Sequence, residues 1–115
     1  MMFDWTDYRK QLLARIAEFG RISPETIRGY RALGDAGAKT GLLDPKTREL
    51  IALAVAVTRQ CDGCITVHTD AAIKHGATRE EIAEALGVAV AVNAGAALIY
   101  SARVMDAYSA HQVEP

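Results

Sequence analysis

Apolar residues recur at helical spacing from the start of this chain. The first run predicts an amphipathic helix ending near Gly20, because charged residues separate its apolar positions. Those positions are Trp5, Tyr8, Leu12, Ile16 and Phe19. The Ser-Pro-Glu segment at 23–25 predicts a second helix, with a capping hydroxyl, a proline at N1 and an acid in the first turn. Gly34 and Gly37 weaken that helix in its second half.

A third helix is expected to begin at Asp44 and Pro45. Residues 50–57 are apolar on every side of this helix, which predicts a central, fully buried element. The polar segment 58–60 then breaks the chain. A fourth helix should begin at or near Cys61 and end at Gly76, where glycine suits the position after a helix.

The last third of the chain is almost entirely apolar between Glu84 and Tyr100. Valines alternate with alanines there, so a strand is conceivable, but Thr78 and Glu81 form a capping-box pattern that favours helix. We expect a fifth helix to about Val92, a break around Asn93, and a sixth helix over 94–108. The prediction is therefore an all-α single domain, 1–115, of about six helices.

A membrane-spanning helix is the alternative for the same apolar run. With Asn93 interrupting it, neither half reaches the roughly 20 apolar residues that a spanning helix needs. The sequence analysis therefore predicts no membrane insertion.

Composition narrows the choice of partners. The net charge is -1, which gives no electrostatic case for binding nucleic acid or an anionic membrane. The N-terminal residues lack the basic and apolar regions of a signal peptide, so a cytoplasmic location is expected. In that reducing compartment a Cys-X-X-Cys pair is more often catalytic or metal-binding than structural.

Candidate chemistry is concentrated between Glu49 and His68. Eleven residues separate Glu49 from Cys61, two separate Cys61 from Cys64, and three separate Cys64 from His68. In a helix, Cys61, Cys64 and His68 would project from one face. Cys64 and His68 are an i,i+4 pair, close enough for a thiol to pass a proton to an imidazole. The pattern indicates redox chemistry.

Such a thiol has to be activated before it can react. A free cysteine with a pKa near 8.5 is only about 3% thiolate at pH 7, and lowering the pKa by two units takes about 2.7 kcal/mol. A helix N-terminus and a nearby imidazolium both favour the thiolate. If the third and fourth helices pack antiparallel, the Glu49 carboxylate can orient the His68 ring.

These motifs together resemble those of the AhpD-like alkylhydroperoxidases of the carboxymuconolactone decarboxylase superfamily. The matching parts are Glu-X11-Cys-X2-Cys-X3-His, the segment 43–51 before it and the segment 76–82 after it, within a resemblance over about 27–105. The resemblance implies an all-α fold and a peroxide-reducing dithiol. It implies Glu49 and His68 as proton relay, Cys64 as attacking thiol and Cys61 as resolving thiol. One departure is Gly63, which stands where the namesake has a histidine.

The resemblance also bears on activity and partners. The superfamily's decarboxylases lack the cysteine pair, which argues against lactone decarboxylation. A hydroperoxide is the expected substrate, and an outside dithiol of lipoyl or thioredoxin-like kind is the expected reductant. No bound cofactor or metal is expected. The chain is 50% hydrophobic with only 6% aromatics, so we expect self-association, and the resemblance suggests a homo-hexamer.

Other interpretations of the same residues stay open. Cys61, Cys64, His68 and Glu49 could be four zinc ligands, and the cysteines could be plain core residues. A reversible disulfide could also serve a non-catalytic redox sensor, a partner-binding oligomer or a disulfide reductase. A sensor needs two thiols but has no need of Glu49 and His68.

Overall fold

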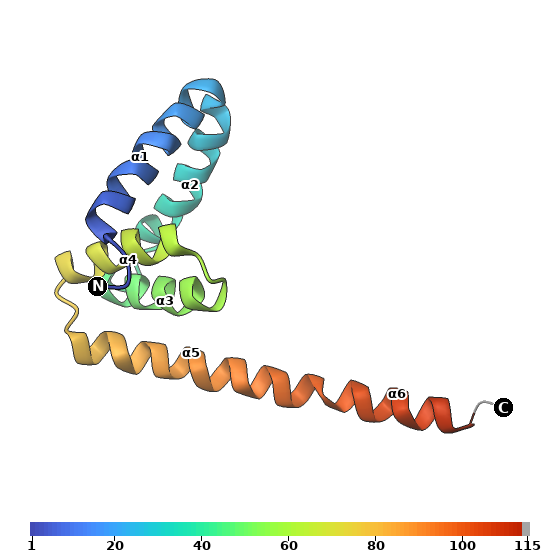
Figure 1. Ribbon diagram of the computed structural model, residues 1–115. Coiled ribbons are helices and arrows are strands. Elements are labelled where there is room, and N and C mark those ends of the chain that lie inside the picture. Colours follow the sequence, from blue (N-terminus) through green and yellow to red (C-terminus); the bar gives the residue numbers. More distant parts are fainter. Residues whose placement is uncertain (114–115) are drawn as a thin grey trace.

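The computed structural model describes residues 1–113, and every regular element in that range is an α-helix. The helices are α1 (Trp5–Ile22), α2 (Pro24–Thr40), α3 (Pro45–Thr58), α4 (Asp62–Lys74), α5 (Arg79–Tyr100) and α6 (Ala102–Val113). Helices α1 and α2 form a hairpin on one side of α3 and α4, while α5 and α6 run out as an arm (Figure 1). The prediction of an all-α fold is confirmed.

Side-chain caps set several of the helix starts. Asp44 accepts a hydrogen bond from the Thr47 backbone N–H at 2.8 Å and begins α3. Thr78 and Glu81 form the capping box that begins α5, with distances of 3.0 and 2.9 Å. At the end of α4, Gly76 has φ 86°, a left-handed conformation that favours glycine. These local signals are as the sequence predicts.

The core of this chain is small and lies where α3 packs against both α4 and α5. The buried residues within 1–113 are Leu53, Ala56, Thr66, Ala72 and Ala89. The expectation that 50–57 is buried on every side is wrong for the single chain. Ile51 is 49% exposed and Val55 55% exposed, because α4 and α5 cover only part of the α3 surface.

The predicted break at Asn93 is also wrong, because α5 continues through it to Tyr100. The Asn93 amide donates to the Ala89 carbonyl oxygen and to Thr58 Oγ1, both at 2.8 Å. Both bonds are compatible with helical backbone, so the polar side chain does not interrupt α5. The interruption comes at Ser101, between α5 and α6.

The arm formed by α5 and α6 makes the chain far less compact than its length allows. The radius of gyration of the chain is 19.3 Å, against about 13 Å for a compact domain of this size. Many of the arm's large apolar side chains are exposed: Val88, Val90, Val92, Leu98, Ile99, Tyr100, Val104, Met105, Tyr108 and Val113. In this isolated chain the arm is an uncovered surface.

The stretch Arg79–Val113 is long and apolar enough to cross a membrane by length and composition, and only 6% of its most apolar window is buried. The sequence argument against such a span assumed a break at Asn93 that does not exist. One such helix is weak evidence for a membrane, because core helices of soluble proteins have the same length and composition.

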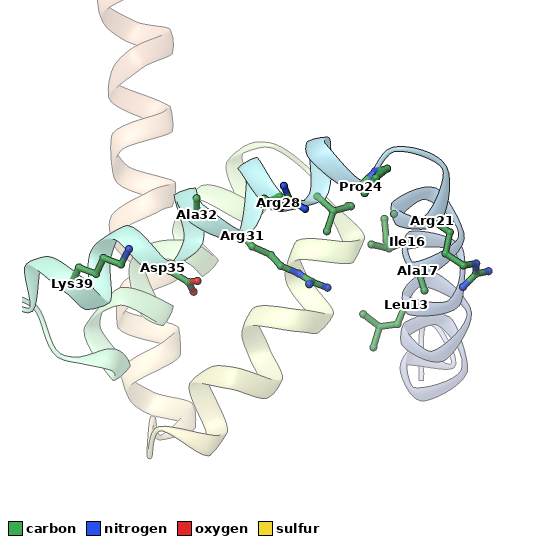
Figure 2. Close-up of a pocket in the computed structure, with 12 residues that line it drawn as sticks. Leu13, Ile16, Ala17, Arg21, Pro24, Arg28, Arg31, Ala32, Asp35 and Lys39 are labelled. Atoms are coloured by element: carbon green, nitrogen blue, oxygen red, sulfur yellow. The ribbon is translucent and has the colours of Figure 1, made fainter.

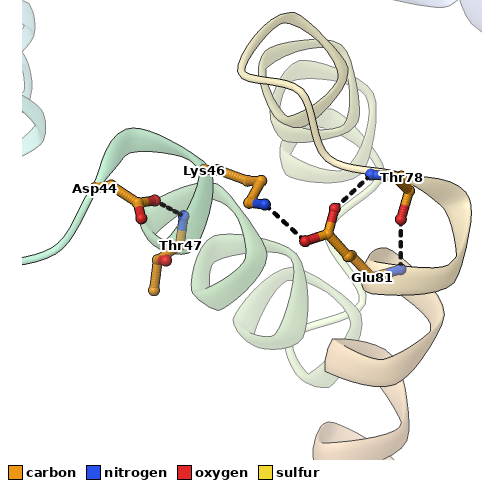
Figure 3. Close-up of polar contacts among 5 residues, drawn as sticks. All are labelled: Asp44, Lys46, Thr47, Thr78 and Glu81. Atoms are coloured by element: carbon orange, nitrogen blue, oxygen red, sulfur yellow. Dashed lines mark hydrogen bonds and ion pairs between the residues drawn. The ribbon is translucent and has the colours of Figure 1, made fainter.

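A polar contact joins the starts of α3 and α5. Lys46 Nζ lies 2.6 Å from Glu81 Oε2, and Glu81 also accepts from the Thr78 backbone (Figure 3). The hydrogen bond from Lys46 is the main cause that lowers the pKa of Glu81, and the same bond raises the pKa of Lys46. The pair therefore ties the first turn of α5 to the helix that carries Glu49.

We predict that Lys46→Met lowers the thermal midpoint slightly at neutral pH, with Lys10→Met as the control on the exposed face of α1. Because the pKa of folded Glu81 is lowered, its contribution is present above its usual value near 4.5 and is lost as the pH falls through the folded value. Because the pKa of Lys46 is raised, its contribution is present below its usual value near 10.5 and is lost above the folded value. Calorimetry across pH should find a higher thermal midpoint for the wild type than for Lys46→Met between these two limits. An advantage that persists at pH 2 would contradict this assignment.

Candidate active site

The turn between α3 and α4 places the first cysteine. Thr58 Oγ1 donates to the Ala54 carbonyl oxygen at 2.8 Å, and Gln60 takes a φ of 53°. The Cys61 N–H then donates to the Ala56 carbonyl oxygen at 3.1 Å. These contacts reverse the chain within three residues, so that α4 folds back on α3.

Cys61 is the N-cap of α4 and has extended backbone geometry, so α4 begins next to Cys61 as the sequence predicts. Its sulfur accepts a hydrogen bond from the Cys64 backbone N–H at 3.2 Å. The two cysteines form a disulfide with a Cα–Cα distance of 5.3 Å, and both are half-buried. The pair therefore lies in the first turn of a helix, where unpaired amides and the helix dipole favour an anion such as a thiolate.

The packing of α3 on α4 also brings Glu49 to His68. His68 Nδ1 lies 2.7 Å from Glu49 Oε2, and the side chains are 31% and 21% exposed respectively. An ionised carboxylate only accepts hydrogen bonds, so Nδ1 carries the hydrogen and Nε2 is left as the acceptor of a neutral ring. His68 is one helical turn after Cys64, and side chains so spaced are neighbours about 5–6 Å apart at Cβ.

The structure thus joins the four sequence-predicted residues in two pairs, Cys61 with Cys64 and Glu49 with His68, and His68 follows Cys64 by one turn of α4. Within 1–113 no group of three His, Cys, Asp or Glu side chains is placed to hold a metal ion. In this structure the two sulfurs are bonded to each other. The arrangement can accept and return a proton beside a reversible disulfide.

Sequence analysis missed a close approach of α1 to α4, which Leu12 makes at Gly63. A Cβ placed on Gly63, between the two cysteines, would lie 2.9 Å from Leu12 Cδ2. The sequence assigned Leu12 only to the apolar face of an amphipathic helix. The glycine at 63 was the available signal, since glycine in a helix often marks a close approach of another element.

A hollow of the described chain lies away from these residues. It is a groove of about 820 Å³ between α1 and α2, with Leu13, Ile16 and Ala17 on one wall and Arg28 and Arg31 on the other (Figure 2). None of the four site residues lines it. The chemistry of the cysteine pair is therefore separate from this groove.

Comparison with known proteins identifies the family. The model of the carboxymuconolactone decarboxylase family matches residues 24–107, which include Glu49, Cys61, Cys64 and His68. The chain belongs to the carboxymuconolactone decarboxylase family. Helix α1, with Leu12, lies before the matched residues.

Similar sequences occur in several bacteria. An uncharacterised Haemophilus influenzae protein is 46% identical over 109 residues, covering 95% of this chain and 96% of its own length. A Paracoccus denitrificans protein, uncharacterised protein 4 of the cox locus, is 37% identical and covers 80% of this chain and 83% of its own. These relatives establish kinship along nearly the whole chain.

Two solved structures share the fold. The apo form of a carboxymuconolactone decarboxylase family protein from Legionella pneumophila is 41% identical, with a TM-score of 0.73 over 91% of this chain and 94% of its own. A Methanobacterium thermoautotrophicum protein is 30% identical, with a TM-score of 0.68 over 75% of this chain and 97% of its own. The all-α arrangement is therefore shared by crystal structures of related chains.

Proposed function

We propose that this protein is a thiol-dependent peroxidase that reduces hydroperoxides through a Cys61–Cys64 redox disulfide. The observation that carries the proposal is the Glu49–His68 hydrogen bond of 2.7 Å, one helical turn from Cys64. A structural or sensing disulfide has no need of an oriented base beside it. A thiol that reduces peroxide does need such a base, because the base takes the proton of the thiol and then passes it to the leaving group.

The proposed cycle starts from the reduced pair. His68 accepts the Cys64 proton through Nε2, while Glu49 holds the ring through Nδ1. The Cys64 thiolate attacks one peroxide oxygen, the O–O bond breaks, and the leaving alkoxide takes the proton from His68 to become an alcohol. Cys64 is then a sulfenic acid.

The second half of the cycle regenerates the thiols. The Cys61 thiol attacks the Cys64 sulfenic sulfur, water leaves, and the disulfide seen in this structure forms. A lipoyl or thioredoxin-like dithiol then supplies two electrons and two protons, and is itself oxidised to a disulfide. Cys61 at the cap and Cys64 in the first turn are already close enough to form the bond without refolding α4.

The assignment of Cys64 as attacking thiol is testable with single-cysteine variants. After one equivalent of hydroperoxide, mass spectrometry should find a sulfenic acid at Cys64 in Cys61→Ser and no oxidised sulfur in Cys64→Ser. A serine hydroxyl is neither ionised nor soft enough to attack peroxide, so Cys64→Ser should lose turnover. Sulfenic acid at Cys61 in Cys64→Ser, with none at Cys64 in Cys61→Ser, would reverse the two roles.

The proposed relay makes a separate prediction about rate. His68→Ala and Glu49→Ala should lower peroxide consumption with dithiothreitol by roughly 10²–10⁴, the usual loss when a general base is removed. His75→Ala is the matched control, because His75 caps the far end of the same helix. Equal rates in all three variants would refute the relay. Disulfide cycling without any peroxide consumption would instead favour the sensor or disulfide reductase.

We further propose that the protein works as a homo-oligomer, with the hexamer as the size suggested by the family resemblance. The isolated chain exposes 9265 Å², about 3,000 Å² more than a compact monomer of its mass. A standard interface covers about 800 Å² on each partner, so this excess matches a large obligate contact or more than one neighbour. The exposed apolar arm supplies much of that surface.

Light scattering in detergent-free buffer at micromolar concentration should therefore give the mass of an oligomer, a whole-number multiple, at least two, of the 12.4 kDa chain. Leu98→Glu on the arm should reduce the oligomer size, because it buries a charge in the contact. Leu42→Glu, which makes the same change on an exposed connection away from the arm, is the control. A stable wild-type monomer, or a chain that disperses only in detergent, would contradict the proposal.

A further inference from the structure

A series of hydrogen bonds joins α5 to the end of α3. The side-chain amide of Asn93 donates to the Ala89 carbonyl oxygen of α5 and to the Thr58 hydroxyl of α3, each at 2.8 Å. The Thr58 hydroxyl donates in turn to the Ala54 carbonyl oxygen, also at 2.8 Å. Every donor hydrogen of the two side chains therefore has an acceptor. The bonds connect the backbones of two helices that pack against each other (Figure 1).

This connection lies where the chain turns toward the cysteine pair. Thr58 is the last residue of α3, and two residues separate it from Cys61. The second of them, Gln60, has a φ of 53°, a left-handed conformation that residues other than glycine seldom adopt. The Cys61 N–H then donates to the Ala56 carbonyl oxygen at 3.1 Å. A short turn with little conformational freedom thus sets the position of Cys61, and the first residue of that turn is bonded to α5.

The two cysteines are held in different ways. Cys64 lies within α4 and shares its regular backbone, whereas Cys61 precedes the helix as its N-cap. In the oxidised protein the disulfide also fixes Cys61. After reduction, Cys61 is held by the turn and by the hydrogen bond that its sulfur accepts from the Cys64 N–H. The turn therefore matters most for the cysteine that lies outside the helix.

We propose that Asn93 is a positioning residue for Cys61 and acts through Thr58. The Asn93–Thr58 bond keeps the turn in the geometry that presents the Cys61 sulfur to Cys64, so it stabilises the disulfide form more than the reduced form. Two groups react or bond more readily when both are already held in place. Within the described residues Asn93 bonds to Ala89 and Thr58 and to neither cysteine. The inference rests on the proposed function only in taking Cys61 as the resolving thiol.

Exchange with dithiothreitol tests the positioning role without any peroxide. Dithiothreitol gives two electrons and two protons to the Cys61–Cys64 disulfide and is itself oxidised to a disulfide. Asn93→Ala and Thr58→Val should each raise the equilibrium constant for this reduction roughly threefold. One net hydrogen bond is worth at most about tenfold, and only part of it depends on the redox state. The double variant should show no larger rise than either single variant, because both remove the same bond.

Two further variants separate positioning from a general loss of stability. Thr58→Ser retains the hydroxyl and should restore the wild-type constant. Thr40→Val is the matched control, because Thr40 ends α2 as Thr58 ends α3, and its hydroxyl donates to the Ala36 carbonyl oxygen at 3.3 Å. Its constant should equal that of the wild type. A wild-type constant in both Asn93→Ala and Thr58→Val would overturn the proposal, and so would the same rise in Thr40→Val.

A second readout tests the role of Asn93 in the proposed cycle. After one equivalent of hydroperoxide, dimedone should trap roughly threefold more Cys64 sulfenic acid in Asn93→Ala than in the wild type, because Cys61 condenses with it more slowly. The rate of the first oxidation should not change, since neither Glu49 nor His68 lies in the turn. If peroxide oxidises no variant, the proposed function fails, and the exchange constants still decide the positioning role. Peroxidase turnover with equal trapping and equal exchange constants would leave the function standing and refute the positioning role.

Discussion

The packing of α3 against α4 is the constraint on which the rest of the structure depends. The reversal at 58–60 lets Cys61 cap α4, and the same antiparallel contact brings Glu49 within 2.7 Å of His68. Leu53 and Ala56 are buried on α3, and Thr66 and Ala72 are buried on α4. A small apolar core thus holds a polar pair and a disulfide in register, and a shift between the two helices would separate the carboxylate from the imidazole while leaving both helices intact.

This core is small for a chain of this length. Only five residues within 1–113 are buried, and the arm of α5 and α6 leaves most of its large apolar side chains exposed. In the proposed oligomer, folding of the α3–α4 contact and assembly through the arm would be linked, because the stability of an obligate oligomer depends on protomer concentration. Asn93 shows one route for that linkage: it sits on the arm helix α5 and bonds to Thr58, at the end of α3, close to the turn that places Cys61.

The parts of this structure that sequence could predict are those set by neighbours in the chain. Asp44 with Thr47, and Thr78 with Glu81, are capping pairs three residues apart, and both helices begin where these residues indicate. Glu49 and His68 could be paired because a short polar break predicts antiparallel helices. The prediction of a helix break at Asn93 was wrong, because the Asn93 side chain bonds to Thr58, and a partner 35 residues away cannot be seen in the local sequence. The exposure of Ile51 and Val55 depends on what covers α3, which helical periodicity alone does not specify.

Leu12 shows why the surroundings of the site were harder to predict than the site itself. The four predicted site residues fall inside the family-matched segment. Their spacing fits a proton relay beside a cysteine pair, so the pattern is visible in the sequence. Leu12 is fifty-one positions before Gly63, and any apolar residue at that face would fit the periodicity of α1 equally well. What distinguishes Leu12 is that its side chain lies close to Gly63, a residue that has no Cβ. The Glu49–His68 contact is thus set by α3 and α4, while the space beside Gly63 is filled from α1, a helix that the family model does not include.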